Sequence, residues 1–348
     1  MRVTKNKYSK LESTNFDNLQ FGKLFSDHMF STTYENGKWG NEEIIPYGPL
    51  QLEPSTHVFH YGQAVFEGMK AYKDLKGNIQ LFRPLENFSR LNASATRLCM
   101  PTIEEELFMN GLKALLKIDS DWVPQSDAKS LYIRPFMIGD STFIRATPSK
   151  RFRFMIITSP TSTYYSGKTA LKIEESYVRS AQGGTGFAKA AGNYAASFAP
   201  TKQAQNEGFT QVIWTDAKSH QYIEESGTMN IMFRIHDSIV TPQLSDSILG
   251  GITRDSILTL AKYKGIEVKE RKISVNEIIK AYKNGSLKEV FGVGTAVTVN
   301  PVHTITHRGY TMHFDSYDDD SYASNLKTDL LNIQYGRSMD IFDWTVKL

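Results

Sequence analysis

The sequence predicts a two-domain α+β protein, and three observations support this prediction. The chain has 348 residues, more than a single domain usually contains. Hydrophobic residues make up 40% of it, which is enough to bury sizeable cores. Segments with the two-residue period of strands alternate with segments of helical period along the whole chain. We expect a small N-terminal domain over residues 1–166, a linker over 167–173 and a larger domain over 174–348.

The periodicity predicts the elements of both halves. In the first half these are helices over 85–98 and 107–116, strands over 131–139 and 151–159, and a turn-rich junction over 160–168. In the second half they are a hairpin over 211–225, a strand over 228–235, a helix over 252–263, a glycine-interrupted strand over 289–299 and a last helix ending at Gly336. A Gly-Gly turn opens the helix at Ile252, and Gly265 ends it.

Charge and cysteine content restrict the class of protein. The 40 basic and 37 acidic residues are interspersed and give a net charge of +3, which does not favour nucleic acid or a membrane surface as partner. Nowhere do about 18 apolar residues run together, so we expect no transmembrane helix. Cys99, the only cysteine, excludes an internal disulfide, and its helical phase predicts burial. The single cysteine makes the cytoplasm the expected compartment. We expect no metal site, because His57 and His60 have no suitably spaced further ligands.

Lys189 is the first candidate for chemistry. It lies among small apolar residues in GTGFAKAAGNYAAS (184–197), with almost no charge nearby. Desolvation favours the neutral amine of a lysine, which can attack an aldehyde and form a Schiff base. A surface lysine on a Gly- and Ala-rich loop is the alternative, and this segment by itself leaves both open.

Two glycine-bearing turns could bind an anion. In ILGGITRD (248–255) the glycines precede a helix start, which presents free backbone N–H groups and the positive end of the helix dipole. Thr253 adds a hydroxyl, and the glycines of GVGTA (292–296) could bring further amides to the same phosphate. An ordinary helix-capping turn is the alternative for each segment.

Four charged residues complete the candidates. Strand alternation sends Glu224 and Glu225 to opposite faces, so one can point inward and would need a cationic partner. A protonated pyridine nitrogen would be such a partner if a pyridoxal cofactor is bound. Arg83 precedes a helix and suits a phosphate, and Tyr132 and Arg134 share one strand face and suit a carboxylate. The alternatives are an exposed acidic pair and surface arginines.

Several segments match one family in order and wording. They are HYGQAVFEGMKAY (60–72), LFRPLENFSRLNASATRLCMP (81–101), DWVPQ (121–125), SLYIRPFMIG (130–139), AKAAGNY (188–194), IEESGTMNIMF (223–233), GGITRD (250–255), EVFGVGTAVTVNPV (289–302) and IQYG (333–336). Together they resemble the branched-chain amino acid aminotransferases, pyridoxal-phosphate enzymes of fold type IV. The resemblance implies a small α/β domain and a larger, β-barrel-like, cofactor-binding domain with flanking helices.

The resemblance also implies an activity and partners. The activity is reversible amino transfer between L-leucine, L-isoleucine or L-valine and 2-oxoglutarate, with pyridoxal 5'-phosphate as cofactor. The partners are these small-molecule amino acids, glutamate and 2-oxo acids, and a second copy of the chain in a homodimer.

Site residues carry over from the matching segments. Lys189 would bear the cofactor as a Schiff base and act as the catalytic base. The resemblance assigns the other cofactor contacts to Arg83, Tyr194, Glu225, Ile252, Thr253 and Thr295. It assigns substrate contacts to Tyr61, Phe66, Tyr132, Tyr164, Thr228, Thr295 and Ala296. Tyr61 is also the candidate to cross the dimer interface, and we expect Arg134 to receive the distal carboxylate of glutamate.

One departure and three alternatives remain. The family often has proline where this chain has Gly250, which should loosen the turn and leave its amides available. D-amino acid aminotransferases and aminodeoxychorismate lyases resemble this chain in scaffold and lysine. Amino transfer from L-leucine, from D-alanine or from neither distinguishes these activities. A non-catalytic pyridoxal-phosphate carrier would need neither Tyr194 nor a substrate pocket.

Overall fold

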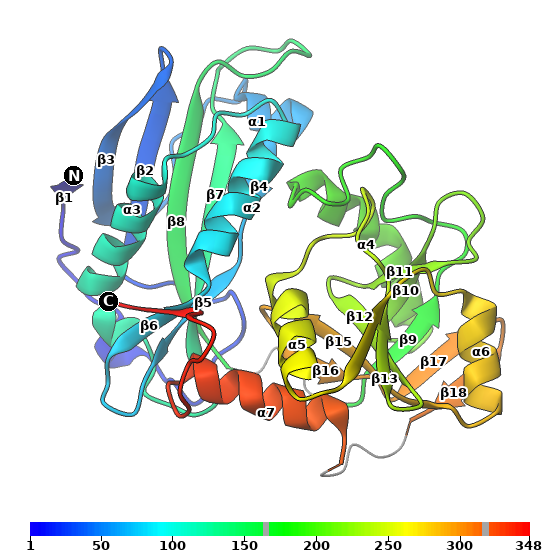
Figure 1. The fold of residues 1–348 in the computed structure, drawn as a ribbon. Coiled ribbons are helices and arrows are strands. Elements are labelled where there is room, and N and C mark those ends of the chain that lie inside the picture. Colours follow the sequence, from blue (N-terminus) through cyan, green and yellow to red (C-terminus); the bar gives the residue numbers. More distant parts are fainter. Residues whose placement is uncertain (163–166, 315–319) are drawn as a thin grey trace. The chain divides into compact units, whose positions relative to one another are not determined.

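The computed structural model describes residues 1–162, 167–314 and 320–348, which form two compact units (Figure 1). Of these residues, unit 1 comprises 1–162, 188–192 and 332–348, and unit 2 comprises 167–187, 193–314 and 320–331. Two segments that follow the expected boundary at residue 166 therefore pack with unit 1. The reason is strand pairing, because Ala190 bridges to Val65 and the C-terminal strand joins the sheet of unit 1. The expected linker 167–173 contains strand β9 (Ala170–Ile173).

Unit 1 is built on one nine-stranded sheet. Its order is β1-β3-β2-β8-β7-β5-β6-β19, and β4 pairs with β7 beside this path. The strands are β1 (Arg2–Val3), β2 (His28–Glu35), β3 (Lys38–Pro46), β4 (Ala64–Phe66), β5 (Met69–Lys73), β6 (Ile79–Phe82), β7 (Ser130–Gly139), β8 (Phe152–Thr161) and β19 (Thr345–Lys347). The strands predicted over 131–139 and 151–159 are confirmed as β7 and β8, which pair antiparallel along their full length.

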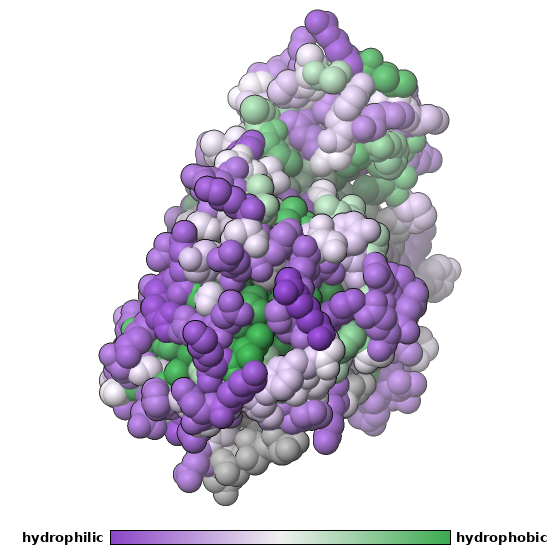
Figure 2. Space-filling view, turned by 90° about the vertical axis from the view of Figure 1, so that its right-hand side faces the viewer, coloured by the Kyte–Doolittle hydropathy of each residue, from purple (hydrophilic) through white to green (hydrophobic). Residues whose placement is uncertain are grey.

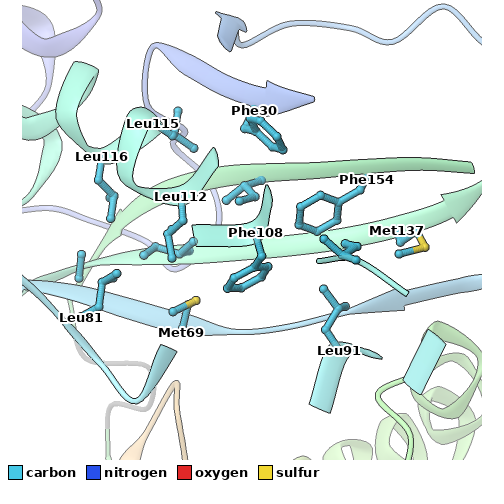
Figure 3. Packing of buried hydrophobic residues seen from close by; sticks show 14 of the residues in the cluster. Phe30, Met69, Leu81, Leu91, Phe108, Leu112, Leu115, Leu116, Met137 and Phe154 are labelled. Atoms are coloured by element: carbon cyan, nitrogen blue, oxygen red, sulfur yellow. The ribbon is translucent and has the colours of Figure 1, made fainter. Parts of the chain in front are cut away.

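Two amphipathic helices cover this sheet, α2 (Pro84–Arg97) and α3 (Glu105–Ile118). Figure 3 shows Phe108, Leu112 and Leu115 of α3 directed at the sheet, where Phe30 and Phe154 belong to the same core. Shorter helices are α1 (His57–Tyr61), η1 (Leu11–Ser13) and η2 (Ser120–Trp122). Both predicted long helices are confirmed.

The expectation that Cys99 is buried is wrong. Helix α2 ends at Arg97, and Cys99 follows it with a φ of 55°. The thiol is exposed, because the chain leaves the helical path before this position. Helical periodicity therefore did not extend to this residue.

Unit 2 combines two five-stranded sheets with helices. One sheet has the order β11-β10-β9-β17-β18 and the other β14-β13-β12-β15-β16. The remaining strands are β10 (Gln211–Thr215), β11 (Ile223–Ser226), β12 (Asn230–Ile235), β13 (Ser238–Thr241), β14 (Glu267–Glu270), β15 (Leu287–Gly294), β16 (Thr298–Pro301), β17 (Thr304–His307) and β18 (Tyr310–His313). The helices are α4 (Ala191–Asn206), α5 (Ile252–Tyr263), α6 (Val275–Lys283) and α7 (Tyr322–Gln334).

Both sheets of unit 2 contribute to one core. Ile213 and Ile305 from the first sheet pack in the same cluster as Ile231 and Val290 from the second. A tight turn between Ser226 and Met229 connects β11 to β12, so it joins the two sheets. The predicted hairpin and the helix over 252–263 are confirmed, as is the α+β class.

Surface hydropathy and helix length are the features relevant to crossing a membrane. Hydrophilic residues predominate on the face shown in Figure 2, with small hydrophobic groups between them. Within the described ranges, no helix combines the length and the apolar character needed to cross a bilayer.

Candidate active site

Lys189 is held by its backbone in unit 1. Its N–H donates to Ser94 Oγ of α2 at 2.9 Å, and its carbonyl accepts from the N–H of Phe66 at 3.1 Å. Ala190 adds the bridge to Val65, so the segment extends the edge formed by β4. The side chain is partly buried, and its Nζ lies 4.9 Å from the centre of the Phe66 ring. This anchoring fixes where the amine can reach.

Glu67, which the sequence reasoning missed, lies beside this lysine. It is fully buried and accepts from Arg90 at 2.7 and 2.9 Å, from Asn87 at 2.7 Å and from the N–H of Gly68 at 3.1 Å. Burial opposes ionisation of Glu67, but the charge and hydrogen bonds of Arg90, followed by the charge of Lys189, lower the pKa of the carboxyl. An acidic residue inside an apolar strand region was the available signal. The site therefore contains a buried carboxylate that faces Lys189.

Tyr132 and Arg134 form one cationic corner of unit 1. Arg134 Nη2 donates to the Tyr132 hydroxyl at 2.8 Å, as their shared strand face predicted. The guanidinium lies 4.4 Å from the centre of the Phe66 ring, and its Nε is buried with no hydrogen-bond partner in the described part of the chain. Phe21, also missed from the sequence, packs edge-on against Tyr132 at 4.8 Å. This corner thus offers aromatic side chains and a guanidinium whose Nε–H has no hydrogen-bond partner among the described residues.

Two further expected residues of unit 1 lie at helix ends. Arg83 is the N-cap of α2, and its side chain is 11% exposed. Tyr61 ends α1 and is partly exposed. Tyr164 lies outside the described residues.

In unit 2, Glu225 is enclosed by donors. Arg179 Nε pairs with one carboxylate oxygen at 2.8 Å, and the other oxygen accepts from the Leu249 N–H at 2.7 Å and from Asn230 Nδ2 at 3.2 Å. Arg179 was not predicted from the sequence, because no local pattern links it to a residue 46 positions further on. These partners favour the charged carboxylate.

Glu224 faces the other side of the strand. It accepts from the Ser247 hydroxyl, and its Oε2 is buried without a partner among the described residues. Burial raises the pKa of this carboxyl. The two neighbouring glutamates therefore have opposite environments, and Glu225 is the one built to stay ionised.

The start of α5 lies next to Glu225. Asn230 Nδ2 also donates to the Leu249 carbonyl at 2.9 Å, so this side chain connects the carboxylate to the turn that precedes the helix. Gly251 is the N-cap and has no side chain to accept from the first-turn amides at Ile252 and Thr253. Unit 2 thus combines a helix start that has no side-chain cap with a buried carboxylate. This pair fits a ligand with a phosphate at one end and a protonated nitrogen at the other.

Four expected contacts lie at turns and a helix start of unit 2. Thr295 and Ala296 form the turn between β15 and β16. The backbone of Thr228 approaches this turn at Gly294, where a Cβ atom would lie 3.9 Å from the Thr228 carbonyl. Tyr194 is in the first turn of α4.

Comparisons with known proteins identify the family. Residues 64–305 match the model described as Amino-transferase class IV. Branched-chain-amino-acid aminotransferase 2 of Bacillus subtilis is 45% identical over 334 residues, which is 95% of this chain and 92% of the relative. The branched-chain amino acid aminotransferase of T.th., solved with pyridoxamine 5'-phosphate, has a TM-score of 0.75 at 25% identity and covers 90% of this chain and 97% of its own. The Escherichia coli branched-chain amino acid aminotransferase gives 0.73 at 25% identity, covering 92% and 98%. The chain belongs to the class IV amino-transferases, and within them to the branched-chain-amino-acid aminotransferases.

Proposed function

We propose that this protein transfers the amino group reversibly between L-leucine, L-isoleucine or L-valine and 2-oxoglutarate, with pyridoxal phosphate as cofactor. The observation that carries the proposal is the link through Asn230 between a buried carboxylate and an open helix start. The substrates named for the relatives support it. Pyridoxal phosphate supplies an electron-withdrawing ring that stabilises negative charge at the substrate Cα.

The residues that the resemblance names would hold this cofactor. From unit 2, the amides at Ile252 and Thr253 and the hydroxyl of Thr295 bind the phosphate, and Glu225 keeps the pyridine nitrogen protonated. Tyr194 donates to the phenolic oxygen of the ring. Arg83 would add a cation to the phosphate. These roles are the proposal, supported by the donors around Glu225.

Lys189 would hold the cofactor covalently, and its Nζ, once displaced from the cofactor by the substrate amine, would be free to accept the proton from the substrate Cα. The hydrogen bonds of its backbone to Ser94 and Phe66 fix the position from which the side chain and its amine extend. Its charge, after that of Arg90, helps to lower the pKa of the buried Glu67 carboxyl, so the amine lies close to that carboxylate. The anchored lysine can therefore act as a base without a search for its position.

The substrate contacts follow from the cationic corner. Tyr132 and the amides at Thr295 and Ala296 receive the α-carboxylate, while Tyr61, Phe66 and Thr228 line the side-chain pocket. Phe21 joins the apolar wall beside Tyr132. Arg134 receives the distal carboxylate of glutamate. This role is supported by its Nε, which is buried without a hydrogen-bond partner among the described residues. Tyr164 keeps its expected role at the pocket as part of the same proposal.

A direct experiment separates this function from its alternatives. The protein, reconstituted with pyridoxal phosphate, is offered L-leucine or D-alanine with 2-oxoglutarate. Transfer from L-leucine alone supports the proposal, transfer from D-alanine indicates the D-amino acid activity, and neither indicates a lyase or a carrier. Lys189→Ala should abolish transfer, and full activity in this variant would contradict the role of Lys189.

We also propose a cytoplasmic homodimer. An exposed apolar group in unit 1 supports the dimer: Phe59 is 60% and Ile144 70% exposed, and the Thr56–Thr142 bridge brings their segments together. Tyr61, on the same helix as Phe59, lies at this group. Sedimentation should give twice the chain mass, and Ile144→Glu should shift it towards the monomer. A monomeric wild type would refute the dimer.

A further inference from the structure

We propose that the C-terminal strand is a positioning element for Arg83, with Trp344 setting the backbone and the guanidinium of this phosphate-binding arginine. The inference rests on the proposed role of Arg83. It concerns residues about 260 positions apart, and Trp344 lies outside the part of the chain that matches the class IV model, residues 64–305. The element therefore lies beyond the matched core of the class.

The backbone of Arg83 adopts a conformation that needs support. Its φ of 49° and ψ of 47° lie in the left-handed region, which is unfavourable for a residue with a side chain. Its N–H donates to the Trp344 carbonyl at 2.7 Å. Trp344, the residue just before β19, thus holds Arg83 in this strained geometry, and the geometry decides the direction in which the side chain leaves.

The guanidinium of Arg83 is fixed by the same tryptophan. Its Cζ lies 5.3 Å from the centre of the Trp344 ring, and the indole is 8% exposed. Contact with an aromatic face occupies one side of the planar guanidinium and does not use its in-plane N–H donors. An arginine held in this way loses less conformational entropy when it binds a phosphate.

Trp344 is itself held from three directions. Its ring stacks on Phe342 at 4.4 Å and meets the edge of Phe82 at 5.6 Å. Strand β19 pairs with β6 in the register Thr345 with Phe82. The Asp340 carboxylate accepts from the N–H and the hydroxyl of Thr345 at 2.6 and 2.8 Å. The segment is therefore rigid enough to position a neighbour.

One nearby group competes for Arg83. Glu86, one turn into α2, lies 3.5 Å from the guanidinium and is 56% exposed. An exposed pair of this kind contributes little, so it cannot fix the arginine by itself. The tryptophan face and the backbone bond restrict the arginine in addition to this pair.

The test measures ligand affinity of the full-length apoprotein by calorimetry, with pyridoxamine phosphate and with pyridoxamine, which has no phosphate. Arg83→Ala should weaken pyridoxamine phosphate about thirtyfold. Trp344→Ala should weaken it about tenfold and leave pyridoxamine unchanged, while Trp344→Phe, which keeps an aromatic face, should stay within about threefold. Trp39→Ala is the matched control, because this indole packs on Tyr34 and Phe154 in the same unit.

Coupling separates positioning from general stability. If Trp344 acts through Arg83, adding Trp344→Ala to Arg83→Ala should cost no further affinity. Additive losses, or equal losses for both ligands, would overturn the inference and leave Trp344 a structural residue. If Trp344→Ala keeps the wild-type affinity while Arg83→Ala is impaired, the inference about Trp344 is overturned and the proposed role of Arg83 stands. Unchanged affinity in Arg83→Ala would instead remove Arg83 from the proposed function.

Discussion

The side-chain oxygen of Asn230 occupies the space beside Gly251. A Cβ atom on Gly251 would collide with Asn230 Oδ1, although its φ of −72° and ψ of 128° suit any residue. Glycine is therefore required for the room it leaves and not for its backbone freedom. Gly250, one residue earlier, has ordinary space, with Leu244 Cδ1 at 3.7 Å as its nearest neighbour.

Adjacent glycines should respond differently to the same substitution. Gly251→Ala should displace Asn230 from Glu225 and cost about 1–3 kcal/mol of stability, with weaker cofactor binding, because the site is overpacked. Gly250→Ala should stay within about 0.5 kcal/mol. Chemical denaturation and cofactor titration measure both. In an Asn230→Ala background Gly251→Ala should cost nothing more, and an undiminished cost there would show that the collision is not the cause.

Glu67 should contribute stability that disappears in acid. Its folded pKa is lower than the ordinary 4.5, so its contribution is complete above pH 4.5 and is lost as pH falls through the folded pKa. Glu67→Gln leaves Arg90 without its charged partner and should cost about 3 kcal/mol at about pH 7. The difference from wild type should shrink below pH 4.5. Glu86→Gln, an exposed position on α2, the helix of Arg90, is the control. A pH-independent deficit in Glu67→Gln would contradict the ionised carboxylate.

Glu224 should behave in the opposite direction. Its folded pKa is raised above 4.5 by burial, so the folded state resists losing this proton and stability falls as pH rises through 4.5. Glu224→Gln removes the penalty, so its melting temperature should exceed that of wild type at about pH 7 and match it at about pH 4. Glu225→Gln, the neighbouring isosteric change, breaks the pair with Arg179 and should show no such gain. Equal thermal shifts in both variants would contradict the assignment of the two faces.

The sequence correctly predicted features that depend on residues close together in the chain. The start of α5 at Ile252 follows from its glycines, and the contact of Tyr132 with Arg134 follows from the two-residue strand period. Helix α4 was missed, because it has Pro200 inside it and no apolar face that recurs at helical spacing. Its first turn is nevertheless where Tyr194 lies.

The other features of the site depend on contacts between residues that are far apart in the sequence. Arg179 meets Glu225 only through the fold of unit 2, and Arg90 meets Glu67 from a helix packed on the sheet. The assignment of residues 188–192 to unit 1 depends on the pairing of Ala190 with Val65, which no periodicity in either segment encodes. Of these two pairs the sequence predicted only Glu225, because the other three residues join the site through contacts that the fold creates.

Arg134 should distinguish the two half-reactions. One site must accept an apolar side chain and, in the reverse direction, the distal carboxylate of glutamate. The guanidinium packs on Phe66, so its stem and face belong to the apolar wall, while its buried Nε has no partner among the described residues and can donate to an anion. Arg134→Met keeps the apolar volume and removes the donor, so the loss should be selective.

Single-turnover absorbance of the bound cofactor measures each half-reaction separately. Arg134→Met should slow the glutamate half-reaction about thirtyfold, the value of a lost charge-assisted bond, and leave the leucine half-reaction within about threefold. Arg134→Lys should recover only part of the glutamate rate, because a lysine keeps the charge without the planar fork. Wild type should prefer leucine to alanine about fiftyfold in kcat/KM, since three more buried carbons contribute roughly 0.8 kcal/mol each. Equal losses in both half-reactions would make Arg134 a support of the pocket wall, and no preference for leucine would contradict the branched-chain substrate itself.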